Sequence, residues 1–141
     1  MNLPSPFPTA ESLTLPSDAD LSMRVTPMPA DANVNGDIFG GWIMAHVDLA
    51  GAVMAARLSK GRIVTVAVNQ FVFKQPVSVG DLLSFYTYLE RIGRTSITIR
   101  VEVYAERNPA DIQIVKVTEA NLTYVAIDAQ GQPREIRPAA S

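Results

Sequence analysis

The chain contains no cysteine and only one histidine, His46, among its 141 residues. The absence of cysteine excludes disulfide bonds, metal sites built from thiolates and a cysteine nucleophile. A single histidine excludes metal sites that need several imidazoles, and any Ser-His-Asp triad would depend on His46 alone. We therefore expect no metal site in this protein.

A strong charge of either sign is also missing. Lys and Arg number 12 and Asp and Glu number 14, so the formal net charge is −2. No basic patch of the kind that nucleic-acid binding requires is visible. The N-terminus lacks a basic region followed by an apolar run, the pattern of a signal peptide. The apolar stretches are too short for a membrane span of about 20 residues. The sequence predicts a cytoplasmic protein that binds neither nucleic acid nor membrane.

The most unusual stretch that is present runs from residue 35 to residue 57. Between Trp42 and Ala56 it is apolar on every side of a helix, with His46 and Asp48 as the exceptions. A helix that is apolar all round is buried. We therefore expect a central helix at about 41–58, covered by other elements and ended by Gly61 as a left-handed cap. Burying a carboxylate is unfavourable in free energy unless it is paired or hydrogen-bonded, so we expect Asp48 to have a partner or a function.

The start of this helix is rich in glycine, with Gly36, Gly40 and Gly41. Free N–H groups at a helix start, together with the positive end of the helix dipole, attract a negative oxygen. That oxygen is either a phosphate oxygen or an oxyanion that forms in a reaction. The alternative interpretation is that the glycines only form a tight turn and Asp37 only caps the helix.

The spacing of Gly41 and Asp48 bears on this choice. The two residues are seven positions apart, so they lie on one face of the helix. They are also roughly 10 Å apart along the axis, so one helix cannot place both against the same reacting carbonyl. Two antiparallel helices related by a two-fold axis can do so. The spacing therefore predicts an isologous dimer with two shared sites.

After the helix the hydrophobic period changes to that of strands. Strands are predicted at 62–73, 82–91, 95–106 and 112–127, and a short one at 21–25 precedes the helix. Short loops between them favour antiparallel pairing. The expected class is α+β, with a twisted antiparallel sheet wrapped around the helix in one domain at 21–128. Residues 1–20 are read as a flexible N-terminal arm and 129–141 as a C-terminal tail.

Several motifs resemble one known family. The strings NGDIFGGWIM (35–44) and GRIVTVAV (61–68), with Asp48 between them, strongly resemble the hotdog-fold acyl-CoA thioesterases, above all the bacterial broad-range hydrolases of the YciA type. The strings PVSVGD (76–81) and GRTS (93–96) fit as well. The resemblance covers roughly 21–127. It implies a hotdog fold, a dimer whose sheets join edge to edge, and further assembly, commonly into a hexamer that is a trimer of dimers.

The resemblance also implies an activity, the hydrolysis of acyl-CoA to a free carboxylic acid and coenzyme A, with no separate cofactor. By position, Asp48 matches the catalytic carboxylate, acting as general base or as nucleophile. Asp37 from the opposite chain would orient the water or the substrate. The backbone N–H of Gly41, with that of Gly40, would polarise the thioester carbonyl. Thr65 would help to position the water.

Coenzyme A carries phosphates, so donors and positive charges are expected near the mouth of the site. The candidates are Lys74, Arg91, Arg94, Thr95 and Ser96. The alternative interpretation of each is an ordinary solvated side chain.

Two other types of residue on the helix need an interpretation. His46 lies two residues from Asp48, a spacing at which helical side chains do not face each other, so we read it as structural. Trp42, Ile43, Met44 and Met54 line either an acyl channel or plain core.

Two other functions remain in competition with hydrolysis. A hotdog hydratase or dehydratase of acyl thioesters typically pairs its acid with a histidine at the helix start, and none is present there. A non-catalytic acyl-CoA-binding protein would be supported by a missing carboxylate, but Asp48 is present. Fold alone does not choose among these functions.

Overall fold

The computed structural model describes residues 12–136. Within them lie one α-helix, α1 (Gly40–Ser59), and the strands β1 (Leu21–Val25), β2 (Ile63–Phe73), β3 (Leu82–Ile92), β4 (Ser96–Arg107) and β5 (Gln113–Ala126). Two short 3-10 helices, η1 (Asp18–Asp20) and η2 (Pro29–Asp31), flank β1. No helix in these residues combines the length and the apolar character needed to cross a membrane.

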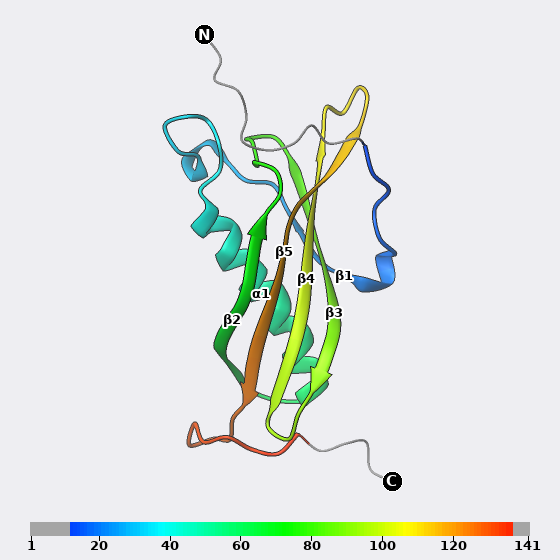
Figure 1. Ribbon diagram of the computed structural model, residues 1–141. Coiled ribbons are helices and arrows are strands. Elements are labelled where there is room, and N and C mark those ends of the chain that lie inside the picture. Colours follow the sequence, from blue (N-terminus) through cyan, green and yellow to red (C-terminus); the bar gives the residue numbers. More distant parts are fainter. Residues whose placement is uncertain (1–11, 137–141) are drawn as a thin grey trace.

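The strands form one antiparallel sheet in the order β1-β3-β4-β5-β2 (Figure 1). Strands β3, β4 and β5 follow one another through short turns and make the centre, while β2 and β1 form the two edges. Each observed strand end lies within one residue of the predicted end. The expected α+β class, with an antiparallel sheet and one central helix, is confirmed.

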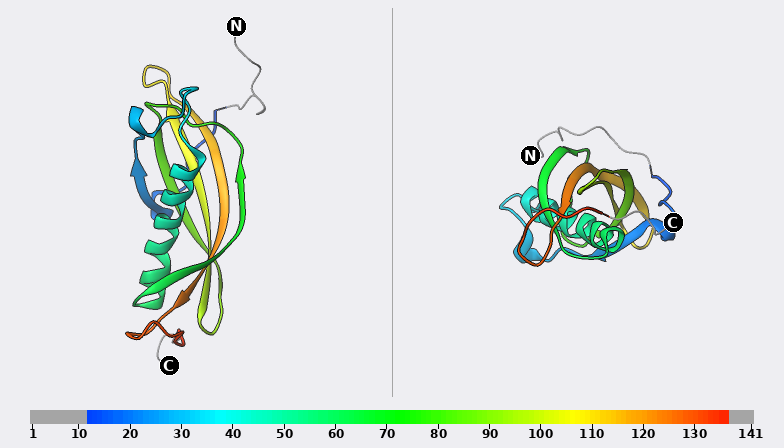
Figure 2. Two further views of the ribbon diagram at one scale, coloured as in Figure 1. Left: turned by 90° about the vertical axis from the view of Figure 1, so that its left-hand side faces the viewer. Right: turned by 90° about the horizontal axis from the view of Figure 1, so that it is seen from below.

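The sheet curls around α1, as the view along the helix shows (Figure 2, right). The alternation in β4 explains which face turns inward, because Ile97, Ile99, Val101 and Val103 are buried while the residues between them are less so. They pack in one core cluster with the helix residues Ile43, Val47, Ala50 and Ala55. Apolar burial of this kind is the main favourable contribution to folding.

The opposite side of α1 is not covered by any of residues 12–136. Met44 is 41% exposed and Leu49 is 56% exposed, although the sequence predicted a helix buried on every side. On the neighbouring edge strand β2, Val64, Val66 and Val68 are also exposed. In Figure 2 (left), α1 and β2 lie at the two margins of one side of the molecule. We call these five residues the apolar face. Exposed apolar side chains on an edge strand are typical of an interaction surface.

The helix ends differ in detail from the prediction. The N-cap residue is Phe39, so Asp37 is not the cap. At the other end Lys60, not Gly61, takes the left-handed conformation, with φ 57°. The predicted cap role of Gly61 is therefore wrong. A Cβ on Gly61 would lie 2.6 Å from the guanidinium of Arg134. The glycine thus makes room for that side chain.

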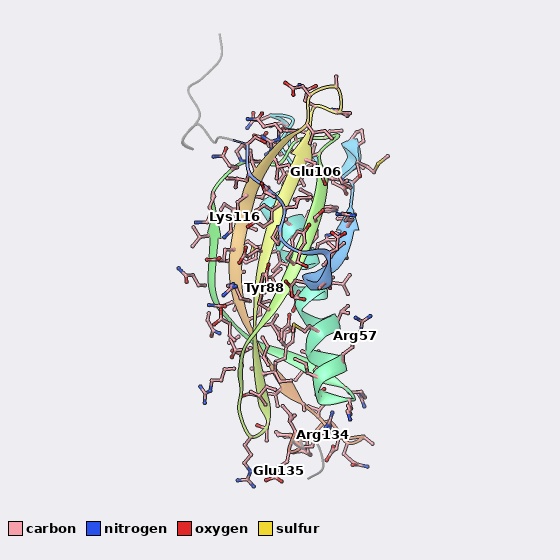
Figure 3. All side chains as sticks on the ribbon, turned by 90° about the vertical axis from the view of Figure 1, so that its right-hand side faces the viewer. Arg57, Tyr88, Glu106, Lys116, Arg134 and Glu135 are labelled. Carbon is pink, nitrogen blue, oxygen red and sulfur yellow. The ribbon has the colours of Figure 1, made fainter. Side chains whose placement is uncertain are left out.

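Arg134 stabilises the C-terminal end of α1. Its Nη2 donates a hydrogen bond of 2.9 Å to the carbonyl of Ser59, and its Nε donates to the carbonyl of Ile127. Figure 3 shows Arg134 beside the last turn of the helix. A positive charge at this end is favourable because the last carbonyls of a helix carry negative partial charge.

Parts of the predicted arm and tail lie within the described residues. In the arm, the N–H of Leu13 donates to the carbonyl of Ile114 over 2.8 Å. In the tail, Ile136 is buried, and its N–H donates to the carbonyl of Arg94. These segments therefore pack on the sheet and on the β3–β4 turn. Residues 1–11 and 137–141 lie outside the described residues.

A buried ion pair holds the loop between β2 and β3. Asp81 is almost fully buried, and its Oδ2 accepts hydrogen bonds from the N–H of Ser78 (3.0 Å) and from Arg107 Nη2 (2.9 Å). The same Arg107 nitrogen donates to the carbonyl of Pro76. This loop pairs with residues 37 and 38 just before α1. The ion pair thus contributes to the position of the helix start.

The first prediction concerns this ion pair. Replacing Arg107→Met leaves the Asp81 carboxylate buried without its charged partner, a change that typically costs about 3–5 kcal/mol. We expect a loss of that size in the free energy of unfolding, measured by denaturant titration at fixed protein concentration. The matched control is Arg94→Met, because Arg94 pairs with Glu135 in solvent, with exposed fractions of 82% and 63%. The control should lose no more than about 1 kcal/mol. Equal losses in the two variants would contradict the prediction.

Candidate active site

The loop before α1 is shaped by local hydrogen bonds. The side-chain carbonyl of Asn33 accepts from the N–H groups of Asn35 (2.9 Å) and Asp37 (3.1 Å). Gly36 between them has φ 84°, a left-handed conformation that favours glycine. The N–H of Ile38 then donates to the carbonyl of Val77 over 2.8 Å. These contacts direct the chain into the helix and set the position of its first turn.

The first turn of α1 is open. Its N-cap residue Phe39 makes no side-chain hydrogen bond to the turn. Gly41 is exposed, and a Cβ placed on it would meet nothing within 4 Å, whereas one on Gly40 would touch the ring of Phe73 at 3.4 Å. Helix N-terminal N–H groups carry positive partial charge. The space above Gly41 can therefore receive a negative oxygen.

A hollow with a cavity volume of about 220 Å³ adjoins this turn. Most of its lining is apolar, and one carboxylate, Asp37, lies on its wall. The lining residues are Asp37, Ile38, Gly40, Ile43, Phe73, Gln75, Pro76 and Val77. Apolar hollows with a few polar groups are typical binding sites for organic ligands.

The Asp48 carboxylate finds its partner on β2. Thr65 Oγ1 donates a hydrogen bond of 2.7 Å to Asp48 Oδ1. The register of β2 against β5 shifts between Thr65 and Ala67, so the strand is irregular directly after this contact. The bond accounts for one carboxylate oxygen of Asp48. The sequence predicted only that Thr65 would help to position the water, and that role stays a prediction. Asp48 is partly exposed, so the expectation of a fully buried carboxylate is wrong.

A third residue in this region was not found by sequence reasoning. The hydroxyl of Tyr124, on β5, donates a 2.8 Å hydrogen bond to the backbone carbonyl of Asp48. Tyr124 is fully buried. Burial, and then the nearby charge of Asp48, raise the pKa of this phenol above its ordinary value. The sequence signal that could have revealed the contact is Gly51, a glycine in the middle of the helix.

The candidate catalytic residues form two separate groups within one chain. Asp37 and Gly40 meet at the hollow, with Gly41 beside them, and Asp48 meets Thr65 further along α1. Gly40 and Asp48 are eight residues apart, about 12 Å along the helix axis. One chain therefore cannot present both groups to a single carbonyl.

The candidate phosphate-binding residues are also split. The N–H of Lys74 donates to Val117, and the carbonyl of Thr95 accepts from Ala126. These two positions on β5 are nine residues apart, about 30 Å along the strand. Lys74 thus lies near the start of α1, and the β3–β4 turn lies at the opposite end of the sheet (Figure 1). That turn carries or adjoins Arg91, Arg94, Thr95 and Ser96.

His46 has contacts that are independent of Asp48. Its Nδ1 lies 2.8 Å from the carbonyl of Trp42, and the two rings stack with centroids 3.9 Å apart. These contacts agree with a structural role and leave no relay to Asp48. Of the apolar helix residues considered above, Ile43 lines the hollow, while Trp42 and Met54 pack against the core. Within residues 12–136, no group of three or more His, Asp or Glu side chains is placed to hold a metal ion.

The chain is similar in sequence to known thioesterases. The family model described as Thioesterase superfamily matches residues 35–111. The acyl-CoA thioester hydrolase YciA of Escherichia coli is 44% identical over 119 residues, which cover 83% of this chain and 90% of that protein. The residues that the family model matches include Asp37, helix α1 and strand β2, and they end before β5.

Solved structures are similar over most of the chain. A hexameric thioesterase from Yersinia pestis has a TM-score of 0.81 and 43% identity, covering 89% of this chain and 100% of that one. A hexameric hotdog fold thioesterase of Campylobacter jejuni has a TM-score of 0.80 and 40% identity, covering 84% and 90%. The expected hotdog fold is confirmed.

Proposed function

The chain belongs to the thioesterase superfamily, and we propose that it hydrolyses acyl-CoA to a free carboxylic acid and coenzyme A in active sites shared by two chains. The observation that carries this proposal is the Asp48 carboxylate, held by Thr65 on an otherwise apolar helix face. The Escherichia coli relative bears the name of the same activity.

The shared site is supported by the apolar face. Edge strand β2 has no strand on its outer side among the described residues, and exposed apolar side chains lie on it and on α1. A two-fold axis beside β2 would pair two such edges and cover both apolar faces. The helices would then run antiparallel. Gly41 and Asp37 of one chain would approach Asp48 of the partner subunit, which joins the two groups of residues.

In this arrangement the thioester carbonyl oxygen accepts hydrogen bonds from the N–H of Gly41, with that of Gly40, so negative charge on it is stabilised. Asp48 either removes a proton from water, whose oxygen then attacks the carbonyl carbon, or attacks that carbon itself. Thr65 occupies Oδ1 and leaves Oδ2 for this step. In the base route the C–S bond breaks, and the sulfur takes the proton that Asp48 removed from water, which gives the acid and the thiol of coenzyme A. In the nucleophile route the same bond breaks and leaves the acyl group on Asp48 as an anhydride; water then hydrolyses this anhydride to the acid, and the thiolate takes the proton released from that water. Asp37 orients the water or the substrate from the opposite chain.

The same two-fold axis accounts for the split phosphate candidates. Antiparallel pairing of two β2 edges places the Lys74 end of one chain near the β3–β4 turn of the other. Lys74 from one chain, with Arg91, Arg94, Thr95 and Ser96 from the other, would then surround the phosphates of one coenzyme A. The coenzyme is part of the substrate and the product, and no other cofactor is proposed.

The protein assembles as a homo-oligomer, and a hexamer built as a trimer of these dimers fits the hexameric relatives. The proposal includes a cytoplasmic location for this activity.

The second prediction tests the carboxylate. Replacing Asp48→Asn keeps the size of the side chain and removes its charge, so it removes the base or nucleophile. We expect turnover to fall by about 10²–10⁴-fold, measured as thiol release from a panel of short, long and aromatic acyl-CoAs. The matched control is His46→Gln on the same helix, which should keep turnover within about twofold.

Near-normal turnover of the Asp48→Asn protein would remove Asp48 from the mechanism. If folded, oligomeric wild-type protein turned over no acyl-CoA of the panel, hydrolysis of acyl-CoA would be rejected. Binding of the same acyl-CoAs without turnover would then favour the non-catalytic alternative.

The third prediction tests the sharing of sites between chains. An Asp48→Asn chain and an Asp37→Ala chain are each expected to be inactive alone. In a mixed dimer, one of the two sites combines the intact Asp48 of one chain with the intact Asp37 of the other. Random mixing should therefore restore about a quarter of the wild-type sites. The measurement is thiol release after the two chains are co-expressed or refolded together.

The control for this mixture replaces the Asp37→Ala chain with a chain that carries both substitutions. No site in that mixture has an intact Asp48, so no activity should return. If each site lay within one chain, the first mixture would regain no activity. An absence of recovery in that mixture would therefore contradict shared sites.

A further inference from the structure

Asp48 is held from two sides by neighbouring strands. Thr65 on β2 and Tyr124 on β5 are direct cross-strand partners in the sheet. Thr65 Oγ1 donates to the carboxylate of Asp48 over 2.7 Å, and the Tyr124 hydroxyl donates to the backbone carbonyl of the same residue over 2.8 Å. One pair of facing side chains thus contacts both the reactive group and the main chain of one helix residue.

The Tyr124 contact is unusual for a helix interior. A helix carbonyl ordinarily accepts the N–H four residues later, and its second lone pair is free. The tyrosine hydroxyl supplies a second donor to that carbonyl of Asp48. Tyr124 is fully buried, and its phenol, like any tyrosine at neutral pH, is protonated and able to donate. The contact therefore joins the sheet to α1 at the turn that carries the carboxylate.

Gly51 makes this contact possible. A Cβ at position 51 would lie 2.3 Å from the Tyr124 hydroxyl oxygen and 3.2 Å from its Cζ. Glycine is less favourable than alanine inside a helix. The missing methyl group is nevertheless required here, because the ring of Tyr124 occupies its place. Gly51 and Tyr124 thus form one structural unit.

We propose that Tyr124 is a positioning residue for the Asp48 carboxylate, which it places through the backbone of α1, and that Gly51 serves to admit its hydroxyl. The inference rests on the proposed function of Asp48. The position of α1 matters because the carboxylate must meet a carbonyl held by the other chain. Displacement of a catalytic group by about 1 Å can cost about 100-fold in rate.

The fourth prediction compares two tyrosines. Tyr124→Phe removes the hydroxyl and keeps the buried ring. The matched control is Tyr104→Phe, because Tyr104 is also buried and its hydroxyl donates a 2.8 Å bond, to Glu102. We expect Tyr124→Phe to lower kcat for acyl-CoA by about 10–100-fold with KM changed less than about twofold. Tyr104→Phe should keep both constants. Equal kcat in wild type and Tyr124→Phe, or equal losses in the two variants, would overturn the proposal.

A second comparison tests the role of Gly51. Gly51→Ala alone should displace α1 or the Tyr124 ring and lower kcat. Adding Tyr124→Phe removes the closest contact, so the double variant should recover to the kcat of Tyr124→Phe alone. Additive losses in the double variant would show that Gly51 and Tyr124 act independently, against the proposal.

A readout without substrate separates this inference from the proposed function. Hydrogen exchange followed by mass spectrometry should show faster exchange of the α1 amides at 44–56 in Tyr124→Phe and no change in Tyr104→Phe. If wild-type protein were inactive on every acyl-CoA, the proposed function would fail, and exchange alone would decide whether Tyr124 holds the Asp48 turn. Unchanged exchange in Tyr124→Phe would overturn the positioning role.

Discussion

The proposed chemistry depends on the position of one carboxylate on a mostly apolar helix. Asp48 is partly exposed, and contacts from the sheet fix both its side chain and its main chain. Thr65 donates a hydrogen bond to the carboxylate of Asp48, and Tyr124 donates one to the backbone carbonyl of the same residue. Both donors come from adjacent strands, so the pairing of β2 with β5 decides whether the carboxylate is in place. The sheet therefore serves as the support of the site as well as the wall of the core.

The division of the site between chains has the same origin. The open first turn of α1 and the Asp48 carboxylate lie about 12 Å apart on one rigid helix, so no movement within the chain can join them. The apolar face, exposed on α1 and β2, needs cover. A second copy across a two-fold axis meets both requirements at once. A surface that is unfavourable in the isolated chain thus becomes the location of the proposed chemistry.

Much of this could be predicted because the signals are local. The helical run of apolar residues and the alternation in β4 indicated the elements, and the strand ends agree within one residue. The family resemblance pointed to Asp48 and Thr65 as site residues, but the hydrogen bond between them appeared only in the structure. The helix cap was wrong because Gly61 is needed for the approach of Arg134, a residue far along the chain. The exposed side of α1 was missed because apolar residues predict burial, but they do not indicate whether the same chain or a partner chain buries them.

The sequence by itself determined the order of the elements, the class of the fold and the type of group at each candidate position, since these depend on residues a few positions apart. Only the tertiary structure decided that Tyr124 and Thr65 face each other across two strands and both reach Asp48. It also decided that the phosphate candidates lie at opposite ends of the sheet. The physical reason is that strand register and side-chain contacts join residues that are distant in the chain. The local hydrophobic periodicity of the sequence does not specify which of these residues come into contact.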